Sequence, residues 1–331
     1  MPVRYRNIGR SGISASIIGL GTWSLSGWMW GGTEEANAIA TIHAALDAGI
    51  NLIDTAPAYG VGLAERLVAN AIHGRRDKVI LATKCGLVWH TREGKYHEEQ
   101  WGKQVYRFLG PHSIRHEVEQ SLDRLGTDYL DLYQTHWQDE TTPIEDTMDT
   151  LVRLKEEGKI RAVGVSNVSL AQLKKYQTRG AVDSVQEEYS MLNRDVEANL
   201  LPYCRENEIA MLSYSPLAQG LLAGTASPER EFPKGDFRRN HARFSYENRV
   251  KSAALMRSIE PIARDRRVSL AHVSVAWTIS SAHATHALVG ARSPEQARES
   301  ALAGGLELSE SELAFINRQV ERLAADIPHL L

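Results

Sequence analysis

The chain has 331 residues, of which 43% are hydrophobic and 24% charged, with a formal net charge of −3. This composition can fill a core, and the weak negative charge argues against a nucleic-acid or anionic-membrane partner. No apolar run approaches the roughly 18 residues of a membrane span, and the opening MPVRYRNIGR lacks a signal-peptide core. The two cysteines, Cys85 and Cys204, lack the spacing of metal ligands and suggest a reducing compartment. We therefore expect a cytoplasmic protein.

Eight short apolar runs bounded by turn residues predict β-strands. They are residues 17–21, 50–54, 78–84, 128–133, 160–166, 184–189, 209–214 and 286–290. Stretches with helical spacing alternate with them, at residues 34–49, 62–74, 112–126, 143–158, 169–177, 195–208 and 293–304. Ser113, Ser169 and Ser293 are expected to begin helices. Alternation of this kind implies a parallel sheet, and eight units predict one α/β domain over residues 1–331, a (β/α)₈ TIM barrel.

Two further segments complete the predicted fold. Residues around Gly9 and Gly12 are expected to form a hairpin that closes the bottom of the barrel. Between the last two strands lies a loop rich in Gly, Pro and charge (218–248), followed by helical stretches at 251–265 and 269–282. A loop of that length at the mouth of a barrel is expected to be functional.

Four residues that together can protonate a carbonyl occur in a fixed order. Asp54 and Tyr59 lie in INLIDTAPAYG, Lys84 in VILATKC and His136 in YLDLYQTH. Asp54, Lys84 and His136 follow three successive predicted strands, so they should meet at the C-terminal mouth of the barrel, where such barrels carry their chemistry. The sequence therefore predicts a catalytic group of four at that mouth.

The chemistry of these residue types favours a reductase. A free phenol titrates near ~10, and a lysine ammonium beside it favours the phenolate and lowers that pKa. An aspartate keeps the lysine charged, and a neutral histidine can donate a hydrogen bond to the carbonyl oxygen. Each residue alone has a common structural role, such as a buried tyrosine or a surface lysine, so the prediction depends on their joint position. His112 and His116 have helical spacing but no third ligand, and we expect no metal site.

The motifs GLGTWSLSG, INLIDTAPAYGVGLAE, VILATKCG, YLDLYQTHW, EGKIRAVGVSN, YSPLAQGLLAG and GARSPEQ identify the family that the chain resembles. Over essentially its full length it resembles the aldo-keto reductases, in particular the longer-chain bacterial branch related to potassium-channel β subunits. The resemblance implies hydride transfer between a nicotinamide and an aldehyde or ketone without a metal. It also implies that Tyr59 is the proton donor, that Lys84 and Asp54 tune it, and that His136 orients the carbonyl.

The resemblance further implies a cofactor site without a Rossmann fold, and Gly19-Leu20-Gly21 indeed lacks the third glycine of the dinucleotide fingerprint. The carboxamide of the nicotinamide is assigned to Ser166, Asn167 and Gln186, and Tyr214 is assigned to stack on its ring. The other residues assigned to the nicotinamide half of the cofactor are Gly21, Thr22, Trp23 and Asp54. Those assigned to the pyrophosphate are Ser215, Leu217, Gln219 and Gly220, and those around the adenosine are Gly290, Ala291, Arg292, Gln296, Glu299 and Ser300. The alternatives are a plain helix cap at Ser166-Asn167 and a core role for Tyr214.

Two departures from the family pattern bear on the cofactor. Gly290-Ala291 stands where short-chain members often have Lys-Ser, and Ser300 stands where many members have Asn. Arg292 is then the best candidate to bind a 2′-phosphate, so we expect NADPH to be preferred, with NADH as the alternative.

The substrate is expected to be a small carbonyl compound or alcohol. Trp23, Trp30, Trp89 and Trp137, together with Trp28, lie in loops after predicted strands and could form an apolar or sugar-stacking wall. No motif selects one substrate or an oligomeric state. A rival hypothesis is a regulatory subunit that binds a nicotinamide cofactor and turns over slowly, and steady-state turnover would distinguish the two.

Overall fold

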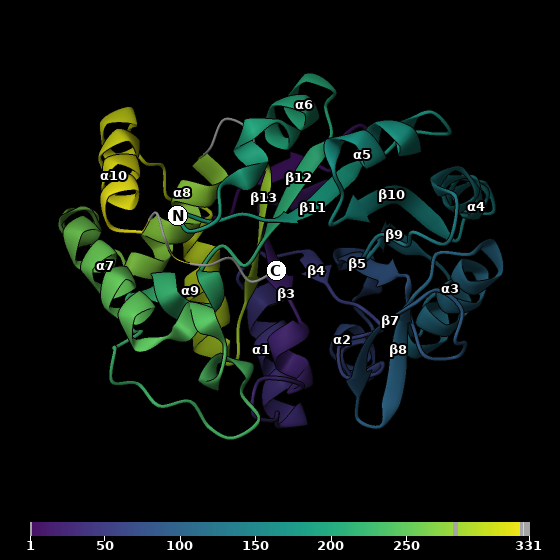
Figure 1. The fold of residues 1–331 in the computed structure, drawn as a ribbon, viewed down its shortest axis with the longest axis horizontal. Helices are drawn as coiled ribbons and strands as arrows, with labels where there is room; N and C mark the ends of the chain where they lie inside the picture. The colour runs from purple at the N-terminus through teal and green to yellow at the C-terminus, as the bar shows by residue number, and fades with distance from the viewer. Residues whose placement is uncertain (1, 281–283, 325–326, 328–331) are drawn as a thin grey trace.

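The chain forms a closed barrel of eight parallel strands with helices around it (Figure 1). The computed structural model describes residues 2–280, 284–324 and 327. The barrel strands are β3 (Ile18–Gly21), β4 (Leu52–Asp54), β5 (Ile80–Cys85), β9 (Leu130–Thr135), β10 (Ile160–Ser166), β11 (Ser184–Glu188), β12 (Ala210–Tyr214) and β13 (His286–Gly290). They pair in chain order, and β13 closes the barrel by pairing with β3. Each predicted strand overlaps one of these, so the predicted (β/α)₈ barrel is confirmed.

Helices cover the outside of the barrel. They are α1 (Glu35–Asp47), α2 (Leu63–Ile72), α3 (Pro111–Leu125), α4 (Ile144–Glu156), α5 (Leu170–Gln177), α6 (Leu200–Glu206), α7 (Tyr246–Arg266), α8 (Leu270–Ser280), α9 (Pro294–Ala303) and α10 (Glu310–Leu323). The last two residues of the predicted helical stretch 269–282 lie outside the described residues. In the described part of the chain, no helix has the length and apolar character needed to cross a membrane.

The helix starts follow the sequence in two cases of three. Ser169 and Ser293 cap α5 and α9, where each side chain accepts a hydrogen bond from the backbone N–H three residues ahead. The prediction for Ser113 is wrong. Helix α3 begins at Pro111, a residue suited to the first helical turn because it lacks an N–H, and Ser113 is buried inside the helix with its hydroxyl 3.2 Å from Glu117 Oε1.

The bottom of the barrel is closed by the predicted hairpin. Strands β1 (Tyr5–Asn7) and β2 (Ser14–Ser16) pair antiparallel. Ile8 and Ile13, in and beside the turn, pack in one cluster with inward-facing barrel residues such as Leu52 and Leu132. Gly9 has a φ of +53°, and a Cβ there would lie 2.2 Å from the carbonyl oxygen of Asp183, so only glycine fits.

The mouth of the barrel carries a small sheet that was not predicted. After β5 the chain forms β6 (Leu87–Val88), β7 (Lys95–Gln100) and β8 (Lys103–Arg107), which pair antiparallel in the order β6-β8-β7. The turn between β7 and β8 uses two positive φ angles, +46° at Trp101 and +75° at Gly102. The β7–β8 hairpin projects from the barrel in the lower right of Figure 1.

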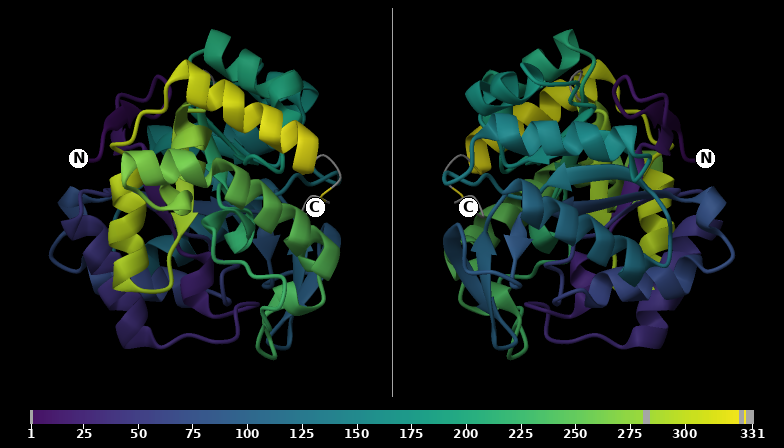
Figure 2. Two further views of the ribbon diagram at one scale, coloured as in Figure 1. Left: turned by 90° about the vertical axis from the view of Figure 1, so that its left-hand side faces the viewer. Right: turned by 90° about the vertical axis from the view of Figure 1, so that its right-hand side faces the viewer.

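The long loop between β12 and α7 crosses the mouth from the other side, and we call its residues 218–245 the strap. Its backbone joins the loop after β3, because Phe237 N donates to Met29 O at 2.9 Å and Trp30 bridges Asp236. Figure 2 shows these two loops meeting at the lower edge of the molecule. The expected functional loop is thus an ordered cover that spans the cavity described below.

Two arginines fix the strap from inside. Arg238 pairs with Asp236 at 2.6 Å, and its guanidinium lies 4.7 Å from the centre of the Trp30 ring. Arg243, which is fully buried, pairs with Glu188 at the end of β11 at 2.6 Å and also donates to Gln219 Oε1 at 3.0 Å. Buried arginine is rarely tolerated without such partners, so these contacts hold the strap in one position.

Candidate active site

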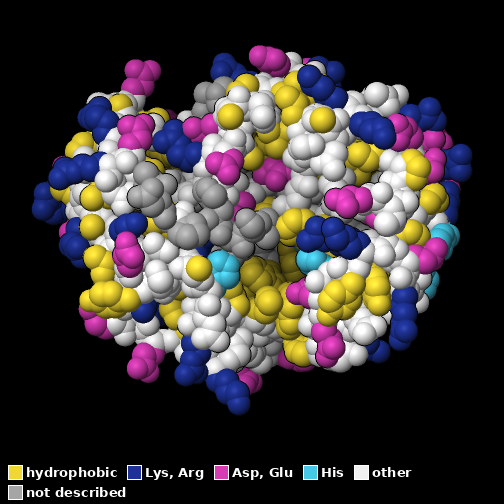
Figure 3. Space-filling model, viewed as in Figure 1, with side chains coloured by type: hydrophobic (Ala, Val, Ile, Leu, Met, Phe, Trp, Pro, Cys, Tyr) yellow, Lys and Arg dark blue, Asp and Glu magenta, His cyan; other side chains and the backbone are white. Residues whose placement is uncertain are grey.

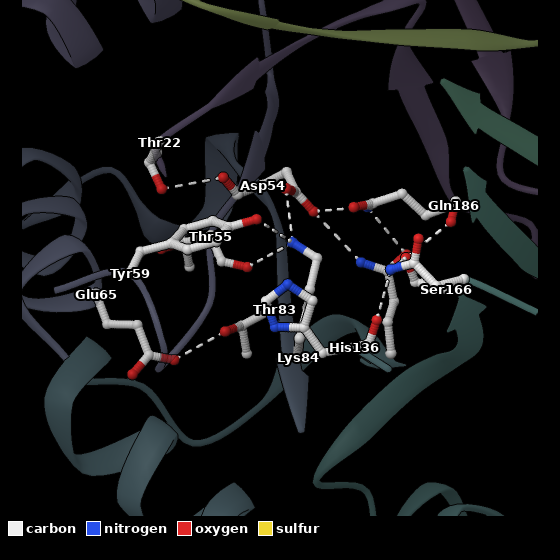
Figure 4. Close-up of polar contacts among 12 residues, drawn as sticks. Thr22, Asp54, Thr55, Tyr59, Glu65, Thr83, Lys84, His136, Ser166 and Gln186 are labelled. Carbon is white, nitrogen blue, oxygen red and sulfur yellow. Dashed lines mark hydrogen bonds and ion pairs between the residues drawn. The ribbon is translucent and has the colours of Figure 1, made fainter. Parts of the chain in front are cut away.

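The predicted catalytic residues meet at the C-terminal end of β4 and β5. Lys84, with no exposed surface, donates to Asp54 Oδ2 at 2.7 Å, to the Thr55 carbonyl at 2.9 Å and to the Tyr59 hydroxyl oxygen at 3.4 Å. Figure 4 shows the phenol and the carboxylate converging on the ammonium group. The buried ammonium is therefore satisfied by three oxygens, one of them the phenol.

Strand alternation explains why Lys84 points inward. Successive side chains of a strand face opposite sides, so Thr83 faces outward where Lys84 faces the barrel centre. The outward Thr83 hydroxyl donates to Glu65 Oε1 of α2 at 2.8 Å (Figure 4). Arg124 of α3 forms an ion pair with the other carboxylate oxygen of Glu65 at 2.5 Å. This contact between the strand and its covering helices fixes the register that places Lys84.

The ionisation of these groups differs from the expectation in one respect. Burial, with a smaller contribution from Asp54, raises the pKa of Tyr59 well above its usual value, so the expected lowering by Lys84 is outweighed. Burial also lowers the pKa of Lys84, and Asp54 opposes that change. Because a low-dielectric site disfavours every isolated charge, the phenol keeps its proton at neutral pH.

His136 follows β9 and completes the group. Its ring centroid lies 5.6 Å from that of Tyr59, with the planes at 81°. Burial first, and then the charge of Lys84, lowers the pKa of His136 well below its usual value. The ring is therefore neutral at pH 7, as expected, and offers one N–H donor beside the phenol.

Asp54 also joins a chain of amides across the barrel centre. Its Oδ1 accepts from Gln186 Nε2 at 2.9 Å and from Gln134 Nε2 at 3.3 Å. Ser166 donates to the Gln186 carbonyl at 2.7 Å, and Asn167 donates to the His136 carbonyl at 2.8 Å. The network ties together the ends of four strands (Figure 4). Gln134, which is not among the predicted site residues, belongs to it.

The side chains of Asp54, Tyr59, His136 and Gln186 are among those that form the floor of a cavity of about 880 Å³, whereas the fully buried Lys84 does not line it. Aromatic side chains of the loops after β3 and β9 form one part of its wall, namely Trp23, Trp28, Trp30 and Trp137. Polar residues of β7, which were not anticipated, form another part: His97, Glu98 and Gln100. Figure 3 shows a hollow with gathered hydrophobic side chains near the lower centre of the face.

The cavity continues under the strap toward α9. Tyr214, Ser215, Leu217, Gln219 and Gly220 line its middle part. Within residues 214–220 four residues have positive φ, namely Ser215, Ala218, Gln219 and Gly220. The value of +104° at Gly220 is one that only glycine adopts readily. This strained segment of backbone borders the cavity. The Arg238 guanidinium holds it in place by donating a hydrogen bond to the Gln219 carbonyl at 3.1 Å.

The far end of the cavity lies at the start of α9. Gly290, Arg292, Gln296, Glu299 and Ser300 line it, as expected. The exposed Arg292 donates to the Gly32 carbonyl at 3.2 Å, and its own backbone N–H donates to Gln296 Oε1 at 2.8 Å. Arg292 thus directly precedes the N-cap residue of α9, where the helix dipole favours an anion, and its guanidinium reaches the loop after β3.

Four of the expected residues do not line the cavity: Lys84, which is fully buried against Asp54 and Tyr59, and Thr22, Ala291 and Trp89. Thr22 is buried and donates to the Asp54 carbonyl at 3.1 Å, so it holds β4. Ala291 is buried, and its carbonyl accepts from Ser24 at 3.2 Å. Trp89 is absent from the wall because the chain enters the small sheet at Leu87, and that sheet presents β7 in its place. Within residues 2–280 and 284–324, no group of three or more potential side-chain ligands could hold a metal ion.

Comparison with known proteins decides the family. The model of the Aldo/keto reductase family matches residues 17–321. The chain belongs to the aldo/keto reductase family. It is 40% identical over 327 residues to aldo-keto reductase YhdN of Bacillus subtilis (strain 168), covering 98% of this chain and 96% of that protein. It is 39% identical over 322 residues to an NADH-specific methylglyoxal reductase of Escherichia coli (strain K12), covering 96% and 98%.

Among solved structures, the glycerol dehydrogenase AKR11B4 from Gluconobacter oxydans matches with a TM-score of 0.87 and 36% identity, covering 99% of this chain and 98% of that one. Membership of the family makes this chain an NAD(P)H-dependent oxidoreductase of carbonyl compounds and alcohols. The resemblance inferred from DTAPAYG and the later motifs is thereby confirmed.

The residues present fit the nicotinamide cofactor that this aldo/keto reductase uses. The cavity runs without interruption from Tyr59 to Arg292, as an extended dinucleotide requires. A Cβ at Gly290 would meet nothing closer than Ser24 Oγ at 3.5 Å, so glycine keeps this part of the cavity wide. The indole nitrogens of Trp23 and Trp30 are buried without a partner among the described residues, and both side chains line the same cavity.

Proposed function

We propose that this reductase converts aldehydes or ketones to alcohols with NADPH, and that Tyr59 is its general acid. The supporting observation is that the Tyr59 hydroxyl and the neutral His136 ring meet at the cavity floor, with the buried Lys84 ammonium 3.4 Å from the phenol oxygen. In the reverse direction the same groups would oxidise an alcohol, since each step of acid catalysis has its reverse in base catalysis.

The bound nicotinamide supplies or accepts the hydride. His136 donates a hydrogen bond to the carbonyl oxygen and orients it. Tyr59 transfers its proton to that oxygen and becomes a phenolate, which burial alone would strongly disfavour. The Lys84 ammonium, 3.4 Å from the phenol oxygen, stabilises the anion, and Asp54 keeps Lys84 charged.

The residues that would hold the cofactor follow from the cavity. Tyr214 would stack on the nicotinamide, and Ser166, Asn167 and Gln186 would hold its carboxamide. Because Gln186 Nε2 already donates to Asp54, its Oε1 is the atom that remains to accept from the carboxamide NH₂. Gly21 and Trp23 would flank this end, and Ser215, Leu217, Gln219 and Gly220 would line the pyrophosphate under the strap.

The preference for NADPH depends on Arg292. Its backbone N–H donates to Gln296 Oε1 and its side chain lines the cavity just before α9, so the guanidinium could make charge-assisted hydrogen bonds to a 2′-phosphate. One relative is named as NADH-specific, so NADH stays the alternative. The buried free thiols of Cys85 and Cys204 support a reducing compartment, and we propose the cytoplasm.

The test is steady-state turnover of a panel of carbonyls and alcohols with both cofactors, followed by the absorbance of the reduced nicotinamide. The panel includes methylglyoxal and glycerol, which the names of two relatives suggest. The proposal predicts enzymatic turnover with NADPH exceeding that with NADH. Slow, substrate-independent oxidation of the cofactor would favour a regulatory subunit.

A further inference from the structure

The polar part of the cavity wall comes from one irregular strand. Regular alternation along β7 would place Glu98 and Gln100 on one face and His97 on the other. The pairing with β8 shifts between Tyr96 and Glu98, as in a β-bulge, and all three residues His97, Glu98 and Gln100 line the cavity. Bulges beside active sites commonly re-aim a side chain in this way.

This wall stands beside the catalytic group. The ring of His97 lies 5.9 Å from that of Trp137, the residue after His136, and the Arg107 guanidinium lies 4.3 Å from the Trp137 ring centre. At the tip of the hairpin, Trp101 packs against Gly60, the neighbour of Tyr59, since a Cβ on Gly60 would lie 3.0 Å from the indole. A substrate carbonyl held by Tyr59 and His136 would therefore place its other atoms near β7.

The orientation of the Gln100 amide is set by its neighbour. Gln100 Nε2 donates to Glu98 Oε1 at 3.1 Å, and a carboxylate can only accept, so the amide NH₂ is fixed toward Glu98. Gln100 is 1% exposed, and its Oε1 has no hydrogen-bond partner among the described residues. A buried acceptor without a partner carries a desolvation cost of about 1–3 kcal/mol, which a hydroxyl donor entering the cavity would remove.

The two other side chains add an acceptor and a donor. Glu98 lines the cavity with 24% of its side chain exposed, so its carboxylate is accessible to a ligand. His97 Nδ1 accepts from Arg107 Nε at 3.1 Å, and burial together with Arg107 lowers the pKa of His97 to about 4. The neutral ring therefore carries its proton on Nε2, which at 3.8 Å from Glu98 Oε1 is too far for a hydrogen bond.

We propose that β7 selects carbonyl substrates that carry hydroxyl groups next to the carbonyl, namely hydroxyaldehydes and hydroxyketones, with Glu98 and Gln100 accepting from those hydroxyls. This inference rests on the proposed function and names the substrate class for the same site. A purely alkyl substrate would leave these polar groups unsatisfied, which is the situation in which a site discriminates most strongly between related substrates.

The test compares D-glyceraldehyde with propanal, which has the same carbon chain without the hydroxyls. The kcat/KM of each is measured for the wild type and for Gln100→Leu, and the ratio of variant to wild type is compared between substrates. The two free aldehydes differ in hydration and electrophilicity, but these properties are the same for variant and wild type and therefore cancel in that ratio. We expect a loss of about five- to tenfold for glyceraldehyde, as for one lost hydrogen bond, and little change for propanal.

Two further variants make the result decisive. Gln104→Leu is the matched control, because Gln104 lies exposed on β8 of the same hairpin and does not line the cavity. Glu98→Gln removes the acceptor-only partner of the Gln100 amide and should also lower kcat/KM for glyceraldehyde selectively. Propanal turnover shows that each variant is folded.

A selective loss in Gln100→Leu and Glu98→Gln but not in Gln104→Leu supports the inference. Equal effects on both aldehydes, or none, would overturn it and leave the proposed reductase function standing. Failure of the wild type to reduce any carbonyl with either cofactor would overturn the proposed function and this inference with it.

Discussion

Replacing Lys84 by methionine should reduce both stability and catalysis, because the ammonium group is buried and shared. The substitution keeps the shape of the side chain but leaves Asp54 without its cation, although Gln186 and Gln134 still donate to it. Breaking a buried ion pair by removing one partner costs about 3–5 kcal/mol. For a chain of this length that corresponds to a fall of roughly 4–7 °C in melting temperature.

The fall in kcat of Lys84→Met should be larger than a loss of stability alone would cause. The Tyr59 phenolate formed in the reaction loses the cation that lies 3.4 Å away, while Asp54 still repels it. General acid catalysis contributes about 10²–10⁴-fold, and kcat should fall by at least the lower figure, with a shifted pH profile. Asp54→Asn should reduce kcat less, because the cation beside the phenol remains.

The double variant Asp54→Asn/Lys84→Met separates the two effects. With both charges removed, the melting temperature should recover part of the loss seen in Lys84→Met, whereas kcat should not recover. Melting is followed by calorimetry or circular dichroism, and kcat at cofactor saturation. An unchanged kcat in Lys84→Met, or strictly additive losses of melting temperature in the double variant, would refute the reasoning.

The remaining predictions concern the cofactor and the pH dependence of stability. Arg292→Ala should weaken the binding of NADPH about ten- to a hundredfold and leave the binding of NADH nearly unchanged in titrations of tryptophan fluorescence. The control is Arg298→Ala, which changes an exposed arginine within α9. Equal weakening of the binding of both cofactors would contradict a 2′-phosphate contact. Burial raises the pKa of Glu117 to about 8, whereas in the unfolded chain the carboxyl has its ordinary pKa near 4.5. Between these values the folded protein holds a proton that the unfolded chain has lost. The free energy of unfolding should therefore fall as pH rises from about 4.5 to 8. Glu117→Gln should remove this pH dependence, which is on the order of a few kcal/mol in the free energy of unfolding measured by denaturant titration. An unaltered pH profile of stability would show that Glu117 is not protonated in the folded protein.

The barrel and its catalytic floor were predictable because local patterns report them directly. Each strand of the barrel is a short apolar run, and Asp54 and Lys84 end such runs while His136 directly follows another. Parallel strands of a barrel bring these ends to one mouth whatever the connecting loops do. The prediction for Tyr59 rests on its place in the loop after Asp54, and its hydroxyl oxygen lies 3.4 Å from Lys84 Nζ.

The polar wall, and the contacts that hold the predicted loop across the mouth as the strap, could not be derived in this way. The β7–β8 hairpin turns at Trp101-Gly102, which lacks the common Asn-Gly signal, and its strands are charged rather than apolar. The pairs that fix the strap include Arg243 with Glu188, which are 55 residues apart in the chain. Such contacts depend on tertiary packing, which no local pattern specifies. Similarly, the raised pKa of Tyr59 follows from burial, a quantity that the motif does not report.

The most direct test of the account is Tyr59→Phe, assayed for both turnover and cofactor affinity. The substitution removes only the hydroxyl that lies against Lys84 and leaves the ring beside His136. We expect kcat for carbonyl reduction to fall by at least about 10²-fold, while the dissociation constant of the reduced cofactor, from quenching of tryptophan fluorescence, changes little. Turnover near the wild-type rate would contradict the central claim that Tyr59 protonates the carbonyl oxygen.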